Sequence, residues 1–384
     1  MKIVIAPDSF KESLSSAQAA AAIAQGLRQA LPSAELQLLP VADGGEGTVQ
    51  VMVDATRGRF ISKEVTGPLG DRLMARYGIL GKDGTAVIEM AAASGLQLVA
   101  KNERDPRLTG SRGTGELIMD ALERGCRHII LGLGGSACND AGAGMLQALG
   151  LRLLNARGQE LAPGGAALAK LARIETTELH PLLALCRFEL ACDVDNPLCG
   201  ERGASAVFGP QKGATKAMVQ ELDKALAHFA QCLVAGGFAD MRDMPGAGAA
   251  GGMGLAAMAV LNAEVKSGIE LVLGYTGLAE ALREADLLIT GEGCLDKQTL
   301  AGKAPFGVLK LALAQKVQVI GIAGSLGDGA EALLDAGMTA VFPIIPALCS
   351  EDTLLRHAEA NLSHTARNIA ATLGLGMKLA KPCR

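Results

Sequence analysis

Residues 2–56 read KIVIAPDSFKESLSSAQAAAAIAQGLRQALPSAELQLLPVADGGEGTVQVMVDAT, and this stretch decides the fold. The β-branched run Lys2–Ala6 predicts a short strand, and the alanine-rich segment Ser16–Leu31, which a proline stops, predicts a helix. A second strand at Glu35–Ala42 and a second helix at Thr48–Thr56 repeat the order. Two strand–helix units in succession predict a parallel sheet.

The rest of the chain contains two kinds of pattern. The last hundred residues return to alternating strands and helices, with strands predicted at Asp286–Thr290, Val317–Ala323 and Ala340–Ile345. Between about Phe60 and Met90 the sequence predicts antiparallel strands joined by a Gly-Lys-Asp-Gly turn. We therefore expect an α/β protein with two domains. The first contains 1–60 and 286–384, with 105–150 as a further candidate part; the second, about 61–285, is inserted in it.

The composition is that of a folded protein and argues against two classes of partner. Of the 384 residues 49% are apolar, which is enough for buried cores. Aromatic residues are scarce and tryptophan is absent, which argues against a surface that stacks on bases. The net charge of -4 is spread along the chain, so we expect neither a nucleic-acid partner nor a membrane partner.

Several features predict a cytoplasmic protein. Met1 leads directly into the first strand, which leaves no room for a signal peptide. The nine cysteines form no CxxC pair, and Cys186, Cys192 and Cys199 lie too far apart for a zinc knuckle. The uncharged stretch Met244–Ala263 is mostly Gly and Ala with one Pro, so its membrane-insertion energy is poor.

Six segments rich in glycine, in carboxylates or in both are scattered over the chain, most of them after an apolar run. They are APDSFKES (6–13), VADGGEGT (41–48), GLGGSACNDAGAG (132–144), CDVDNPLCG (192–200), GAGAAGGMG (246–254) and TGEGCLDKQTLAGKAP (290–305). Ligands of open α/β sheets bind at the ends of such strands. Glycine lets backbone N–H groups approach phosphate oxygens, and neighbouring Asp, Glu and Lys residues hold metals and neutralise charge. The predicted ligand is phosphorylated and bound to a metal.

The first two segments supply candidates for catalysis and for phosphate binding. In APDSFKES these are Asp8, Ser9 and Lys11, although a simple turn followed by a helix cap explains the same residues. In VADGGEGT two acids flank a Gly-Gly turn before a predicted helix, where an anion is favoured. The candidates there are Asp43, Gly44, Gly45 and Glu46.

The third segment supplies phosphate-binding candidates from a glycine loop. These are Gly134, Gly135, Ser136, Asn139 and Asp140. The stretch 132–137 also satisfies the dinucleotide-binding pattern GxGxxA, but the next predicted strand ends in Asn155 instead of the acid that holds the ribose. We therefore prefer another kind of phosphate site to an NAD site.

The last segments supply metal-binding and catalytic candidates. Asp193 and Asp195 stand two residues apart at a strand end, so both can face one cation, and their oxygens suit Mg²⁺; an Asx turn is the alternative. The segment TGEGCLDKQTLAGKAP lacks the spacing of a Walker A loop. Its candidates are Gly291, Glu292, Gly293, Asp296 and Lys303. GAGAAGGMG fits tight helix packing at least as well as a phosphate loop.

Taken in order, these segments resemble those of the type I glycerate kinase family over the whole length of the chain. The resemblance implies transfer of the ATP γ-phosphoryl group to D-glycerate with Mg²⁺, giving ADP and 2-phosphoglycerate or 3-phosphoglycerate. It also implies a flavodoxin-like domain with a parallel sheet, a mixed-sheet domain that resembles a restriction-endonuclease core, and a cleft between them. The oligomeric state stays open, with a homo-oligomer as one option.

Phosphoryl transfer asks a protein mainly for positioning and for charge neutralisation, which suggests a role for each group of residues. We expect Asp193 and Asp195 to bind Mg²⁺, the GGSACND and TGEGC loops to bind phosphates, and Lys11 and Lys303 to stabilise the transferring charge. Asp43 or Asp8 accepts the proton of the glycerate hydroxyl. Arg112 pairs with the glycerate carboxylate, and Asp296 is a further catalytic candidate.

Two other functions fit part of the pattern. A non-catalytic sensor of nucleotides or sugar acids would use the same glycine loops, but it would gain nothing from the many carboxylates beside them. An NAD-dependent hydroxyacid dehydrogenase would use the GxGxxA match, but the ribose acid and a well-placed histidine base are both missing.

Overall fold

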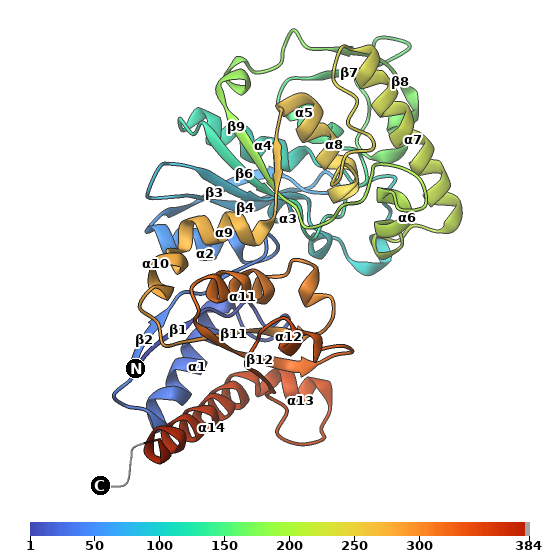
Figure 1. Ribbon diagram of the computed structural model, residues 1–384. Helices are drawn as coiled ribbons and strands as arrows, with labels where there is room; N and C mark the ends of the chain where they lie inside the picture. Colours follow the sequence, from blue (N-terminus) through green and yellow to red (C-terminus); the bar gives the residue numbers. More distant parts are fainter. Residues whose placement is uncertain (381–384) are drawn as a thin grey trace. The chain divides into compact units, whose positions relative to one another are not determined.

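The computed structural model describes residues 1–380, which form two compact units (Figure 1). The first unit contains Met1–Asp43 and the chain from Ile269 onward, and the second contains Gly44–Gly268. The unit boundaries therefore differ from the predicted ones at 60/61 and 285/286. The segment 105–150 lies in the second unit.

The first unit is built on a five-stranded parallel sheet with strand order β13-β12-β11-β1-β2. Its elements are β1 (Lys2–Ile5), α1 (Ser16–Ala30), β2 (Glu35–Leu38), α9 (Gly268–Thr276), α10 (Leu278–Leu282), β11 (Leu287–Leu295), α11 (Ala304–Ala314), β12 (Gln318–Leu326), α12 (Ala332–Asp335), β13 (Ala340–Pro343), α13 (Glu351–Arg356) and α14 (Ala358–Leu379). Counted within the unit, this order is 2-1-3-4-5, that of a flavodoxin-like sheet. The prediction of a parallel, flavodoxin-like sheet is confirmed.

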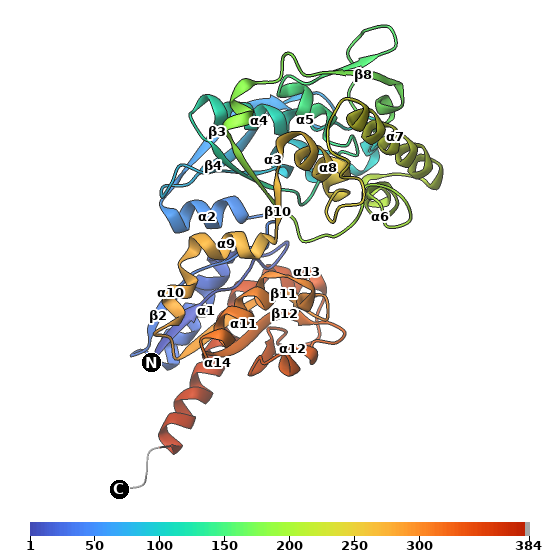
Figure 2. The same cartoon turned by 45° about the horizontal axis from the view of Figure 1, so that its top comes forward.

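Helices cover both faces of this sheet, as parallel strands require. Ile3 and Ile5 point to one face, where they join a core that α1 and α14 supply. Val4 is also fully buried and points to the opposite face. Helix α11 covers that face in the views of Figures 1 and 2.

The second unit is built on a six-stranded mixed sheet with strand order β10-β9-β6-β5-β4-β3. Its elements are α2 (Thr48–Thr56), β3 (Arg59–Thr66), β4 (Arg72–Ile79), β5 (Ala86–Glu89), α3 (Ala91–Ser94), α4 (Arg112–Glu123), β6 (His128–Gly132), α5 (Ala143–Ala148), β7 (Arg152–Asn155), β8 (Leu171–Glu175), β9 (Arg187–Ala191), α6 (Ala204–Phe208), α7 (Lys216–Ala235), α8 (Ala249–Leu261) and β10 (Glu264–Lys266). Strands β5, β6, β9 and β10 are parallel, while β3 and β4 are antiparallel. The mixed sheet and the antiparallel strands were both predicted.

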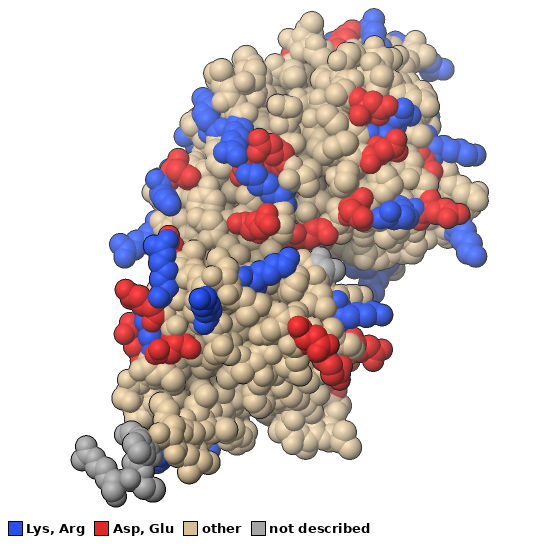
Figure 3. All heavy atoms as spheres, viewed as in Figure 1, with Lys and Arg blue, Asp and Glu red and all other residues tan. Residues whose placement is uncertain are grey.

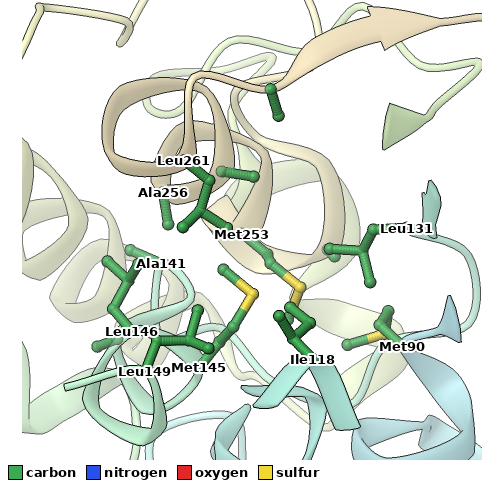
Figure 4. Close-up of a cluster of buried hydrophobic side chains, with 14 of the residues drawn as sticks. Met90, Ile118, Leu131, Ala141, Met145, Leu146, Leu149, Met253, Ala256 and Leu261 are labelled. Atoms are coloured by element: carbon green, nitrogen blue, oxygen red, sulfur yellow. The ribbon is translucent and has the colours of Figure 1, made fainter. Parts of the chain in front are cut away.

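The core of the second unit joins the parallel strands to α4, α5 and α8. Figure 4 shows Met145 of α5 and Met253 of α8 in one buried cluster with Ile118 of α4 and Leu131 of β6. On the other face of the sheet lies α2, which we had expected in the first domain. A Cβ at Gly78 of β4 would lie 2.4 Å from Val53 of α2. This close packing explains why α2 belongs with the second unit.

Two of the glycine-rich segments are not open loops. Strand β11 continues to Leu295, so TGEGC is part of a strand. Glycine at position 291 allows the close pairing with β12, because a Cβ there would lie 1.8 Å from the carbonyl of Ile322. TGEGC is therefore a strand end instead of a loop, and its role in phosphate binding stays a prediction. The GAGAAGGMG segment leads into α8 and is buried, with a Cβ at Gly254 placed 2.0 Å from the carbonyl of Gly246, so it serves helix packing.

On the face that Figure 3 shows, Lys and Arg side chains are interspersed with Asp and Glu instead of forming a patch of one sign. Within residues 1–380, the structure contains no helix with the length and apolarity that a membrane crossing requires.

Candidate active site

The first unit contains a cavity of about 420 Å³, within the range of small-molecule sites. Seven of the predicted residues line it, although they come from three separate segments of the chain. They are Asp8, Ser9, Lys11, Asp43, Glu292, Gly293 and Lys303.

The topology of the sheet explains why these segments meet. Strands β1 and β11 are neighbours, although Ile3 pairs with Leu287, 284 residues further along the chain. The strand order reverses at this pair. Ligands of open α/β sheets bind at the carboxyl ends of the strands around such a reversal. Asp8 follows β1, Glu292 and Gly293 lie in the second half of β11, and Lys303 immediately precedes α11.

Asp8 is a buried carboxyl group that lines the cavity. Only 8% of the residue is exposed, its backbone N–H donates to the carbonyl of Gly291 at 2.8 Å, and its Oδ1 accepts from the N–H of Ser9 at 2.6 Å. Burial, followed by the nearby charges of Asp43 and Glu292, raises the pKa of Asp8 to about 8. A carboxyl group that titrates in this range is suited to general acid–base work near neutral pH.

Glu292 and Lys303 form an ion pair on the wall of the cavity. The distance from Lys303 Nζ to Glu292 Oε2 is 3.4 Å, and the hydroxyl of Thr299 donates to Glu292 Oε1 at 2.9 Å. Burial raises the pKa of Glu292, and the Lys303 ammonium opposes that shift. The lysine is therefore held at a fixed place facing the cavity.

Asp296 is not among the residues that line this cavity. Its Oδ1 accepts from the N–H groups of Gln298 and Thr299 at 2.8 and 3.2 Å, and it lies 3.9 Å from Lys303 Nζ. These contacts indicate a turn-forming side chain that also helps to position the lysine.

In the second unit, other predicted residues meet at the carboxyl ends of β6 and β9. A Cβ at Gly134 would lie 3.2 Å from Gly45 Cα, and one at Gly44 would lie 3.0 Å from Ala191 Cβ. The loop that contains Gly44, Gly45 and Glu46 therefore lies beside the glycine loop after β6. Asp193 joins this group, and its Oδ1 accepts from Ser267 Oγ at 2.9 Å and from the N–H of Gly268 at 3.1 Å.

The glycine loop after β6 has an exposed part and a buried part. Gly134 and Gly135 are exposed, whereas Ser136 is 8%, Asn139 0% and Asp140 1% exposed. Asp140 accepts hydrogen bonds from Ser111 and from two backbone N–H groups of its own loop, and Asn139 donates to Ser205. Asn139 and Asp140 therefore shape the loop from inside instead of facing a ligand.

Two further candidates have partners of their own. The Asp195 carboxylate accepts two hydrogen bonds from Arg202, at 2.9 and 2.8 Å, and is mostly exposed. Arg112, the first residue of α4, pairs with Glu116 at 3.3 Å. A ligand at either residue would have to compete with an existing ion pair.

Glu89 is a residue of this region that the sequence interpretation missed. It ends β5, accepts the N–H of Val49 at 2.9 Å, and has a pKa raised by burial, with Glu46 contributing. It therefore ties the VADGGEGT loop to the sheet. A lone acid at the end of an apolar run was the only signal in the sequence.

The acidic groups do not form a ready-made metal cage. Among residues 1–380, no three His, Cys, Asp or Glu side chains come close enough together to hold a metal ion. Mg²⁺ usually takes one or two carboxylates together with substrate phosphates and water. Asp193 suits that mode, since its carboxylate is exposed at a strand end, whereas Asp195 would first have to leave Arg202.

The glycine segment 132–137 does not open a helix as a dinucleotide-binding loop does. Helix α5 begins only at Ala143 and has six residues. The GxGxxA match is therefore a coincidence of composition.

Comparison with known proteins places the chain in a family. A model of the glycerate kinase family matches residues 3–374. The chain belongs to the glycerate kinase family. It is 52% identical to the glycerate 2-kinase of Escherichia coli strain K12 over 98% of this chain and 99% of that protein, and 52% identical to the glycerate kinase of Bacillus subtilis strain 168 over 98% of both. A crystal structure described as glycerate kinase 2 from Salmonella typhimurium LT2 matches with a TM-score of 0.88 and 52% identity over 98% of this chain and 99% of that one.

Membership in the glycerate kinase family confirms the resemblance that the order of the sequence segments indicated. It also confirms the fold class, because the α/β architecture extends over nearly the full length of the family relative with the solved structure. The roles of individual residues stay predictions, and they are taken up below.

Proposed function

We propose that this protein is a glycerate kinase that transfers the γ-phosphoryl group of ATP to D-glycerate. The product is 2-phosphoglycerate, because a full-length relative with 52% identity is named a glycerate 2-kinase; 3-phosphoglycerate is the alternative. The observation that carries the proposal is the cavity at the strand reversal, where an acid with a raised pKa faces two lysines.

Asp8 is the proposed proton acceptor for the glycerate hydroxyl. Its deprotonated form is available near pH 8, and its burial excludes water from the proton that is transferred. Asp43 lies in the same cavity and raises the pKa of Asp8, so its proposed role is to tune that group.

Lys303 and Lys11 are the proposed partners of the transferring phosphoryl group. Phosphoryl transfer spreads negative charge over the phosphoryl oxygens. Fixed cations in a site that excludes water stabilise this charge more strongly than bulk water does. Glu292 and Asp296 hold Lys303 in place before the substrate arrives. Ser9 and Gly293 line the same space with small, polar surface.

In the second unit, the exposed Gly134 and Gly135 with Gly44, Gly45 and Glu46 form the proposed loop surface for a substrate anion. Asp193 is the proposed Mg²⁺ ligand. When bound, Mg²⁺ neutralises charge on phosphate oxygens and orients them. Asp195, Ser136, Asn139 and Asp140 are left with structural roles, and Arg112 stays a predicted contact of the glycerate carboxylate.

We also propose that the enzyme works in the cytoplasm on small molecules, with neither nucleic acid nor membrane as a partner. Its charged groups alternate in sign on the face shown in Figure 3, and both proposed substrates are small anions. Cell fractionation that finds the protein with the membranes would contradict the location.

The decisive experiment measures ADP release from ATP and Mg²⁺ with D-glycerate, L-glycerate or no acceptor, with phosphorus NMR of the product. We expect ADP only with D-glycerate and the phosphate at C2. Folded protein that binds ATP but releases no ADP with either glycerate would overturn the kinase proposal.

A further inference from the structure

The cavity of the first unit extends well beyond the groups used above, and its two ends differ chemically. Its lining follows the sheet across all five strands: Ile344 and Ile345 come after β13, Gly324 and Ser325 lie in β12, Gly293 lies in β11, Asp8 follows β1 and Asp43 follows β2. Because the strands are parallel, these positions share one edge of the sheet in the same order. The strand that each lining residue belongs to or follows therefore tells whether it lies toward the β13 end or the β2 end of the cavity.

The end over β13 is largely apolar, although the exposed Glu351 of α13 also lines it. Ile344, Ile345, Leu354, Leu355 and Ala358 line it, from the segment after β13 and from helices α13 and α14. The two lysines that line the cavity, Lys11 and Lys303, belong to the β1 and β11 side. Among the lining residues that the structure describes, no lysine or arginine lies at the apolar end.

This polarity matches a nucleoside triphosphate. The purine ring has two apolar faces, whereas the triphosphate is a polyanion that needs cations. Strands lie about 4.8 Å apart, so β13 and β1 are separated by roughly 14 Å, which is comparable with the length of an extended nucleoside triphosphate. Gly293 in the middle leaves the backbone uncovered for the ribose and the first phosphate. A Cβ at Gly324 would lie 2.4 Å from the carbonyl of Gly293, so glycine there serves the pairing of the strands.

Two polar side chains line the apolar end, those of Asn361 and of the exposed Glu351. Asn361, in the first turn of α14, lines the cavity, and no other residue within 1–380 hydrogen-bonds its side-chain amide. An amide has a donor and an acceptor side by side, which complements the N6 amino group and the adjacent ring nitrogen of adenine.

We propose that the apolar end of this cavity binds the adenine ring of ATP and that Asn361 recognises its amino edge. The inference rests on the proposed kinase function for the identity of the nucleotide. It assigns ATP to the first unit, with the base over β12 and β13 and the γ-phosphate toward Lys303.

The test compares Asn361→Ala and Asn361→Asp with the control Asn368→Ala. Asn368 is an exposed position two turns along the same helix, and its amide hydrogen-bonds to His364. ADP binding is measured by calorimetry, which needs no turnover. We expect Asn361→Ala to weaken ADP binding about tenfold, with inorganic triphosphate binding unchanged. A carboxylate accepts from both N–H groups on the guanine edge, so Asn361→Asp should shift the preference from ATP toward GTP.

A second variant tests the apolar wall independently of the amide. Ile345 is 41% exposed, so Ile345→Ser costs little folding energy, and it should weaken ADP but not inorganic triphosphate by severalfold. Unchanged ADP binding in both Asn361→Ala and Ile345→Ser would overturn the inference. If ADP binding falls as expected while glycerate still yields no ADP, the nucleotide site stands and only the kinase proposal fails.

Discussion

The Lys303 ammonium lies 3.4 Å from the Glu292 carboxylate, so an ion pair joins the residue before α11 to the middle of β11. Both side chains line the cavity, and the glutamate is also held by Thr299. A pair of this kind gives little stability on its own account, because desolvation offsets the attraction. Its value is positional: it keeps a flexible lysine aimed at the place where phosphoryl charge develops.

Replacing Lys303 with methionine should therefore lower kcat by roughly 100-fold, the usual cost of removing one group that stabilises transition-state charge. Steady-state ADP release at saturating ATP and D-glycerate measures the effect. Lys310→Met is the matched control, since that lysine lies on the same helix over the ring of Phe306, 4.4 Å from its centroid, and is not among the cavity residues. A kcat within threefold of the parent would refute the role of Lys303.

Asp8 should make the folded protein less stable as the pH rises. Its pKa is about 8 when folded and about 3.9 when unfolded, so the folded state binds the extra proton and stability falls between these two values. We expect Asp8→Asn to raise the free energy of unfolding by about 2–4 kcal/mol at pH 8 and by far less near pH 4.

Urea unfolding at a series of pH values checks this, with Asp54→Asn on the exposed side of α2 as the control. The gain should increase with pH only for Asp8→Asn. A gain that stays constant with pH would mean that the Asp8 carboxyl group does not titrate in this range.

The same group should appear in the pH profile of the reaction. As a proton acceptor, Asp8 must be deprotonated, so kcat/KM for D-glycerate should rise with pH through about 8 and then level off. Asp8→Asn should lose most of the activity at every pH, although the variant is more stable. A parent profile that is flat between pH 6 and 9 would assign the base to another residue.

The sequence predicted the local units of this fold better than their assembly. The helix Thr48–Thr56 was predicted with its observed bounds, because hydrophobic periodicity and a preceding glycine turn are local signals. The packing of that helix on β4 is a long-range contact, and so is the pairing of Ile3 with Leu287. No periodicity in the sequence reports such contacts.

The candidate site shows the same division. An acid after a predicted strand marked Asp8, Glu292 and Asp193 from the sequence alone. The sequence could not distinguish a glycine that exposes a loop, such as Gly134, from one that lets two strands approach, such as Gly291. The apolar end of the cavity carries no motif, because ordinary aliphatic residues line it and only the order of the strands brings them together.

Asp193 and Asp195 allow the metal proposal to be tested by two closely matched substitutions. Asp193 is oriented by Ser267 and Gly268, whereas the Asp195 carboxylate is engaged by Arg202. If Asp193 is the protein ligand of Mg²⁺, Asp193→Asn should lower turnover by at least tenfold and raise the Mg²⁺ concentration needed for half-maximal activity. Asp195→Asn should change both by less than about threefold, because an exposed ion pair contributes little. Circular dichroism and thermal unfolding establish that both variants are folded. Near-normal turnover of Asp193→Asn at saturating Mg²⁺ would remove Asp193 from the metal site, and an equally large effect of Asp195→Asn would restore the two-carboxylate site that the sequence predicts.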